Sequence, residues 1–160
     1  MPTHYSRTQI ILHWAVVLLI ALQFILPDGI SAAWNIFVRG GEKTMTPLAA
    51  QHVISGLLII ALVVWRLVLR FTRGVPPLPA EEPPLMQKAA HVTHFLLYAL
   101  MLAVPVSGMA AWGGQIIPAG DVHDVLKSLL MLLIILHVAA ALFHQFVLKT
   151  NLMARMKRAS

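Results

Sequence analysis

Two histidines, His123 and His137, lie at the ends of an almost wholly apolar segment and are fourteen residues apart. On an α-helix, fourteen steps of about 100° bring the second side chain to within roughly 40° of the direction of the first. At about 1.5 Å per residue their separation along the axis is about 21 Å, most of the roughly 30 Å of a bilayer core. Two imidazoles on one face, one near each membrane surface, could each hold a metal cofactor. This spacing favours a protein that moves electrons across or along a membrane.

The composition fits a membrane protein better than a soluble one. Of the 160 residues, 59% are hydrophobic and only 11% are charged, which is too apolar for a typical soluble domain. There is no cysteine, and this excludes disulfides, iron–sulfur clusters and thiolate zinc sites. The formal charge of +6 is not gathered in a basic segment interleaved with aromatic residues, so we do not expect nucleic-acid binding. A basic balance of this kind is typical of membrane topology and of contact with anionic lipid.

The apolar runs predict an all-α fold, an integral membrane four-helix bundle in a single domain over residues 1–160. The helices are predicted at about residues 8–26, 47–70, 86–112 and 121–148. We interpret the first run as a retained span rather than a secretory signal, because it is long and carries His13, Trp14 and Gln23. Residues 28–47 are predicted to be a polar connection in the membrane interface, residues 76–84 a stiff proline-rich linker, and residues 113–120 a turn.

Lysine and arginine predict the orientation of the bundle. Nine of them lie on the side of the termini and the proline-rich linker, namely Arg7, Arg66, Arg70, Arg73, Lys88, Lys149, Arg155, Lys157 and Arg158. Only Arg39, Lys43 and Lys127 lie on the other side. By the positive-inside rule, both termini are predicted to be cytoplasmic.

Depth in the membrane then predicts two histidine pairs. His13 should be level with His137 on the cytoplasmic side, and His52 level with His123 on the outer side. Each pair could supply the two axial imidazoles of a b-type haem held between helices. No C-x-x-C-H motif is present, so covalent haem attachment is excluded.

The histidines also admit roles that need no haem. They could be hydrogen-bonding core residues or interfacial side chains. Zinc or a di-iron centre is disfavoured, because no intramembrane carboxylate accompanies them. Gly56 and Gly108 could leave room for a flat macrocycle or simply allow close packing of helices.

Three further histidines are candidates for a quinone site beside the inner haem. They are His91, His94 and His144, and an imidazole there could hydrogen-bond a quinone carbonyl and relay a proton. Alternatively they pair with haem propionates, for which Arg7, Arg66 and Arg70 compete. Interfacial snorkelling is the remaining interpretation of these side chains.

Together these residues resemble the bacterial cytochrome b561 family. The resemblance covers essentially the whole chain. Its motifs are Tyr5-Ser6-Arg7 followed by Ile10-x-x-His13-Trp14, Gln51-His52, Arg66 with Arg70, His91-x-x-His94 with Tyr98, the pair His123 and His137, and Ala139 to His144. Similar four-helix cores occur in the cytochrome b subunits of nickel–iron hydrogenases and formate dehydrogenases. Close relatives in the family carry lysines in the proline-rich loop, where this chain has Glu81 and Glu82.

The resemblance implies two non-covalent b haems in a bacterial inner-membrane protein. Their axial ligands would be His13 with His137 and His52 with His123. It also implies electron transfer to or from membrane quinone, with superoxide:ubiquinone oxidoreductase activity favoured. In that case Arg39, Lys43 and Lys127 could form a small cationic patch that draws in the superoxide anion.

Two alternatives compete with this function. The first is a membrane anchor that passes electrons between a partner dehydrogenase or hydrogenase and the quinone pool, although the short loops offer little docking surface. The second is a haem-free structural bundle.

Overall fold

The computed structural model describes residues 4–77, 82–150 and 152–156. This part of the chain is all helical and contains no strand. The helices are α1 (Arg7–Ile25), α2 (Asp28–Val38), α3 (Pro47–Arg73), α4 (Pro84–Trp112), α5 (Ile117–Phe146) and the short 3-10 helix η1 (Leu152–Met156).

Four of these helices, α1, α3, α4 and α5, are long and apolar enough to cross a membrane. They correspond to the four predicted spans, so the predicted fold class is confirmed. The ends differ by a few residues. The largest difference is at α5, which begins at Ile117 rather than near residue 121. Part of the segment predicted to be a turn is therefore its first helical turn, where Pro118 is tolerated because the N–H it lacks would have no helical partner.

The prediction of a polar connection over residues 28–47 was wrong in its first half, which folds as α2. Asp28 lies in the first turn of this helix, where its charge is favourable to the helix dipole. Small residues let α2 approach α3 closely: Ala33 is buried, and a Cβ at Gly29 would overlap Leu48. The glycines and charges of residues 40–43 mark only the second half as a loop.

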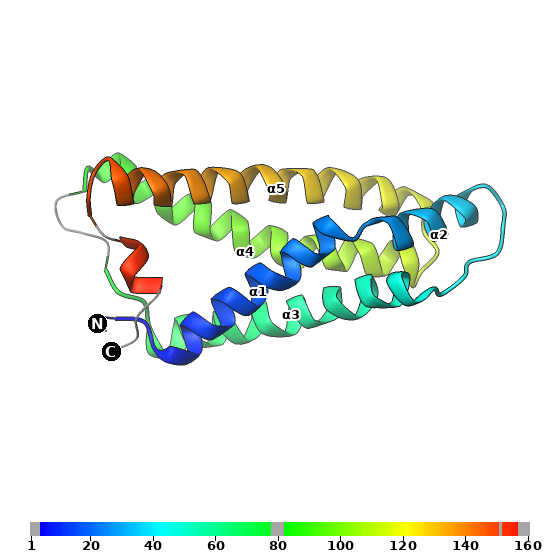
Figure 1. The fold of residues 1–160 in the computed structure, drawn as a ribbon, viewed down its shortest axis with the longest axis horizontal. Coiled ribbons are helices and arrows are strands. Elements are labelled where there is room, and N and C mark those ends of the chain that lie inside the picture. Colours follow the sequence, from blue (N-terminus) through cyan, green and yellow to red (C-terminus); the bar gives the residue numbers. More distant parts are fainter. Residues whose placement is uncertain (1–3, 78–81, 151, 157–160) are drawn as a thin grey trace.

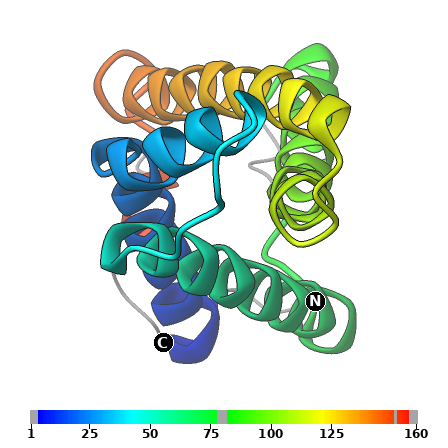
Figure 2. The same cartoon turned by 90° about the vertical axis from the view of Figure 1, so that its right-hand side faces the viewer.

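The four spans form a four-sided bundle when viewed along its long axis (Figure 2). α3 packs against α1, α2 and α4, and the core here is built on Val16, Ile59 and Val63. α5 packs mainly against α4 and makes a small contact with η1, whereas its contacts with α1 and α3 are sparse at most. Accordingly, Leu130 is the sole buried residue of this 30-residue helix.

We call the end of the bundle where α1 begins and α5 finishes the terminal end, and the end that carries α2 the opposite end (Figure 1). At the terminal end the indole Nε1 of Trp14 donates a hydrogen bond to the carbonyl of Met156 over 2.9 Å. Arg155 donates to the carbonyl of Pro77 over 2.7 Å. The first and last described residues therefore lie at the same end, as the even number of spans predicts. The basic residues Lys157 and Arg158 lie outside the described residues.

Local capping fixes the start of α1 against the end of α3. Ser6 and Gln9 form a capping box, which satisfies N–H groups that the first helical turn leaves unpaired. The side-chain amide of the buried Gln9 also donates to the carbonyl of Gly74 over 3.0 Å. Gly74 ends α3 with a φ of 75°, a conformation that favours glycine. Because of these bonds, the turn that carries His13 is held in a fixed position relative to α3.

Candidate functional site

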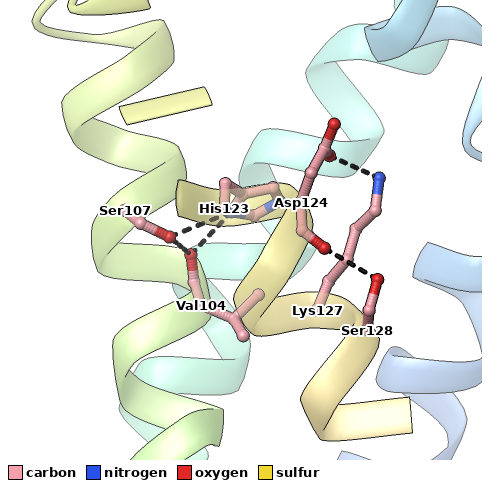
Figure 3. Close-up of polar contacts among 6 residues, drawn as sticks. All are labelled: Val104, Ser107, His123, Asp124, Lys127 and Ser128. Atoms are coloured by element: carbon pink, nitrogen blue, oxygen red, sulfur yellow. Dashed lines mark hydrogen bonds and ion pairs between the residues drawn. The ribbon is translucent and has the colours of Figure 1, made fainter. Parts of the chain in front are cut away.

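The opposite end brings His52 of α3 and His123 of α5 together. Their ring centroids are 6.3 Å apart and the ring planes are inclined at 66°. The Nδ1 atom of His123 lies 2.8 Å from the carbonyl oxygen of Val104 and 3.2 Å from the hydroxyl of Ser107 (Figure 3). Because a carbonyl can only accept, Nδ1 carries the proton, and the lone pair of Nε2 remains available for a metal.

This separation matches that of two imidazoles on either side of one iron. A metal–imidazole bond is about 2 Å long and the nitrogen lies about 1 Å from its ring centre, so such a pair has centroids roughly 6 Å apart. The same separation also lies within the range of an edge-to-face contact between two rings, about 4.5–7 Å. The donor chemistry is also suitable, since neutral imidazoles are common axial ligands of haem iron.

Two more observations at the opposite end concern the room around these rings. A Cβ at Gly108 would lie 3.1 Å from the ring of His123, so a larger residue here would move the imidazole by a few tenths of an ångström. The Nδ1 atom of His52 is buried and has no hydrogen-bond partner among the described residues. Gln23 is close by, because its side-chain amide donates to the backbone carbonyl of His52 over 3.0 Å.

The terminal end gathers three imidazoles rather than two. The rings of His94 and His137 are in contact, with centroids 5.3 Å apart. His13 lies within electrostatic range of both, and of Arg66. The Nδ1 atom of His94 donates to the carbonyl of Ala90 over 2.7 Å, and this again leaves Nε2 available. The structure thus places His13 and His137 in one neighbourhood, as their depth predicts, and adds His94.

The arginines predicted to compete for haem propionates occupy different positions. Arg66 donates to the carbonyl of Gln9 over 3.2 Å, and its guanidinium has further N–H groups for an anion. Arg70 lies over the ring of Tyr98 at 5.9 Å. Arg7 is exposed at the start of α1. Two of the three candidates, Arg66 and Arg70, are therefore near the imidazoles of the terminal end.

Tyr5 joins this cluster just before α1 begins. Burial raises the pKa of its phenol, while the positive charge of Arg70 acts in the opposite direction. Tyr5 is therefore a protonated O–H donor at neutral pH. Sequence reasoning placed this residue in a family motif but did not assign it a role.

The other two quinone candidates have contrasting surroundings. His91 is exposed on α4. His144, in the last turn of α5, is largely buried, with its Nδ1 3.2 Å from a carboxylate oxygen of Glu82 and 3.2 Å from the hydroxyl of Thr150. Glu82 is itself only 7% exposed. No sequence pattern indicates this contact, because a glutamate in a proline-rich loop is typical of a solvated surface.

The cationic patch predicted at the opposite end is largely engaged in local contacts. Lys43 donates to the carbonyl of Trp112 over 2.7 Å and lies over the indole ring at 5.0 Å. Lys127 forms an ion pair with Asp124 over 2.6 Å (Figure 3). In the described part of the chain, Arg39 is the one member of the patch without such a contact.

Comparison with known proteins agrees with this arrangement. A family model described as prokaryotic cytochrome b561 matches residues 4–159. The chain belongs to that family. A cytochrome b562 of Cereibacter sphaeroides is 38% identical over 154 residues, which cover 96% of this chain and 95% of the relative.

Two further members of the cytochrome b561 family resemble the chain over nearly its full length. A probable superoxide oxidase CybB of Yersinia pestis is 32% identical, over 98% of this chain and 97% of the relative. Cytochrome b561 homolog 1 of Escherichia coli is 28% identical, over 95% of this chain and 96% of the relative. The family and the four spans identify a bacterial integral membrane protein. The family implies a b-type haem, and the imidazoles of the opposite end fit that group in chemistry and separation.

Proposed function

We propose that this cytochrome b561 transfers electrons across the bacterial inner membrane through two b haems, from a donor at the opposite end to ubiquinone at the terminal end. The observation that carries the proposal is the pair His52 and His123, whose ring centroids are 6.3 Å apart. Superoxide is the favoured donor, because one relative is named as a probable superoxide oxidase.

The haem ligands in this proposal are His52 with His123 at the opposite end and His13 with His137 at the terminal end. When bound, each haem supplies a one-electron iron couple. Val104 fixes the ring of His123 by accepting from Nδ1, and such a bond orients a ligand and raises its basicity. Arg66 and Arg70 provide positive charge for propionates. The sparse contact of α5 with α1 and α3 supports cofactors between these helices.

The distribution of charge supports a cytoplasmic terminal end. Among the described residues, seven lysines and arginines and one acid lie there. The opposite end has three basic and four acidic residues, of which the acids are Asp28, Glu42, Asp121 and Asp124. The positive-inside rule therefore gives the same orientation that the whole sequence predicts.

The quinone site is proposed at the terminal end, beside His94 and His144, with His91 as a more peripheral candidate. Both ring nitrogens of an imidazole can take part in proton transfer, so a histidine can hydrogen-bond a quinone carbonyl and relay a proton to it. The membrane itself delivers the quinone, since lipid surrounds the apolar faces of the spans.

A second candidate function is a membrane anchor for a soluble redox partner. The opposite end favours this alternative in one respect, because two of its three cations are held by local contacts and acids outnumber bases there. Such a surface attracts an anion such as superoxide only weakly. Co-purification of a redox partner would favour the anchor.

The test is haem reduction by superoxide followed in a stopped-flow spectrometer, with and without ubiquinone-1. The proposal expects a b-type absorption band that appears with superoxide and decays faster when the quinone is present. His144→Ala should leave both haems bound and slow the decay. A purified protein without a b-type band would exclude the proposal and its alternative together.

A further inference from the structure

We propose that Glu82 and His144 form a proton relay that supplies the quinone at the terminal end. This inference rests on the proposed function, since it assigns a proton source to the same site. The observation behind it is a buried carboxylate oxygen 3.2 Å from an imidazole nitrogen, contributed by two segments 62 positions apart in the sequence.

The burial of Glu82 separates it from the other acids. Its side chain is 5% exposed, while that of His144 is 15% exposed. Asp28, Glu42, Asp121 and Asp124 are exposed, and all four lie at the opposite end. A buried carboxylate is costly without a partner, so such groups are retained where a role requires them. Glu82 is thus the one buried acid in the described part of the chain.

The contacts of the pair in the described part of the chain leave one oxygen of Glu82 without an aligned hydrogen-bond donor. The Nδ1 atom of His144 is equally far, at 3.2 Å, from Glu82 Oε1 and from the hydroxyl of Thr150. One N–H group cannot point at both oxygens, and Oε1 has no well-aligned donor among the described residues. The Thr150 hydroxyl donates to the backbone carbonyl of His144 over 3.3 Å, so its oxygen can accept from Nδ1, and a small rotation of the imidazole would point that N–H at the carboxylate instead.

The surrounding charges do not neutralise the carboxylate. Lys88 on α4, Lys149 after α5 and Arg155 on η1 lie at the same end, and none forms an ion pair with Glu82 in the described chain. Arg155 is bound instead to the carbonyl of Pro77. His91 on α4 is exposed. Glu81, the neighbouring acid, lies outside the described residues. His144 is thus the titratable group in contact with Glu82 among the described residues.

The relay follows from the two nitrogens of the imidazole. Reduction of one quinone to the quinol takes up two electrons and two protons. The electrons come singly from the donor of the proposed function, and the protons come from water on the terminal side. The Nε2–H of His144 gives its proton to a carbonyl oxygen and forms the new O–H bond. As that N–H bond breaks, Glu82 passes a proton to Nδ1, so the ring stays neutral, and Glu82 is reprotonated from water. Rotation of the ring or proton exchange with water restores the Nε2–H before the second proton is delivered.

The test compares Glu82→Gln with wild type, and with Glu42→Gln as the matched control, because Glu42 is an exposed acid at the opposite end. The purified reduced protein is oxidised by ubiquinone-1 in a stopped-flow spectrometer across pH, in H2O and in D2O. Equilibrium dialysis of the oxidised protein gives the Kd for ubiquinone-1, and a melting curve gives Tm.

We expect Glu82→Gln to slow the oxidation by about 100-fold, the lower end of the range for loss of one proton-transferring group. Its Kd and Tm should match those of wild type, its solvent isotope effect should rise, and its pH profile should flatten. Glu82→Asp should recover most of the rate, and Glu42→Gln should behave as wild type.

Two outcomes would overturn the relay while leaving the proposed function in place. One is a Glu82→Gln rate equal to wild type at every pH. The other is a slower rate accompanied by a higher Kd, a lower Tm and an unchanged pH profile. That result would show that the contact between Glu82 and His144 only stabilises the structure. A wild-type protein that ubiquinone-1 fails to oxidise would refute the proposed function, and the relay with it.

Discussion

The two ends of the bundle hold their histidines in different surroundings. At the opposite end, two rings lie edge to face and one is fixed by Val104 and Ser107. At the terminal end, three imidazoles lie near two arginines, and a fourth, His144, contacts a buried carboxylate. An electron needs only a fixed pair of ligands. A quinone also needs protons and hydrogen-bond donors, so under the proposed function the difference fits electron entry at one end and coupled electron and proton transfer at the other.

Of the substitutions proposed for the two ends, removing a proposed haem ligand from α5 should have the largest effect, because this helix carries one proposed ligand of each haem. His137→Ala is expected to lower haem per polypeptide to about half of wild type or less, because a lost axial ligand releases one haem and loosens the packing of α5 around the other. A pyridine haemochrome assay measures the haem content. An unchanged content would show that His137 is not a ligand.

Two substitutions can distinguish the roles of the imidazoles at the terminal end. We expect His13→Ala to lose the haem of that end, and His94→Ala to retain it while slowing reaction with quinone. Haem content and the reduced-minus-oxidised spectrum distinguish the variants. The reverse result would make His94, whose ring contacts His137, the axial partner in place of His13.

A smaller change should affect the opposite end alone. Gly108→Ala places a Cβ about 3.1 Å from the ring of His123, so the ring must shift by a few tenths of an ångström. We expect a modest change in one of two haem potentials, measured by redox titration. Gly56→Ala is the matched control, because its added Cβ meets its nearest neighbour, the Gln23 amide, at 3.4 Å. Equal effects of the two changes would contradict a specific constraint on His123.

Salt should produce the smallest effect. If superoxide is the donor, its rate of haem reduction should change by no more than about twofold between low and high ionic strength, because the opposite end has no excess of positive charge. Stopped-flow rates at several salt concentrations measure this. A steep fall in this rate with added salt would show that Arg39, Lys43 and Lys127 do attract superoxide.

The spans, and the depth of each histidine along its span, could be predicted because they depend on local sequence. Apolar runs give helix positions, and the distance of His52 and His123 from the helix ends gives their depth. Depth does not give direction around the helix axis, so the contact between His94 and His137 was not anticipated. The ligand assignments stay predictions, since ring positions alone do not test them.

The remaining features depend on contacts between distant segments. Glu82 is buried where the end of α5 meets the start of α4, and nothing in residues 76–84 indicates this. Lys43 was counted as a free charge, although its partner is a backbone carbonyl 69 residues away. The ion pair of Lys127 with Asp124 is different, because charges three residues apart on a helix are neighbours and could have been paired from the sequence.

The sparse packing of α5 has a consequence for assembly. Its main contacts are with α4, to which a connection of only residues 113–116 joins it, and contacts between nearby segments form early in folding. We expect α4 and α5 to enter the membrane as one hairpin and to pair before the rest of the bundle closes. An order of this kind leaves the lateral face of α5 accessible during biogenesis, so that prosthetic groups can be loaded from the side rather than through a finished protein.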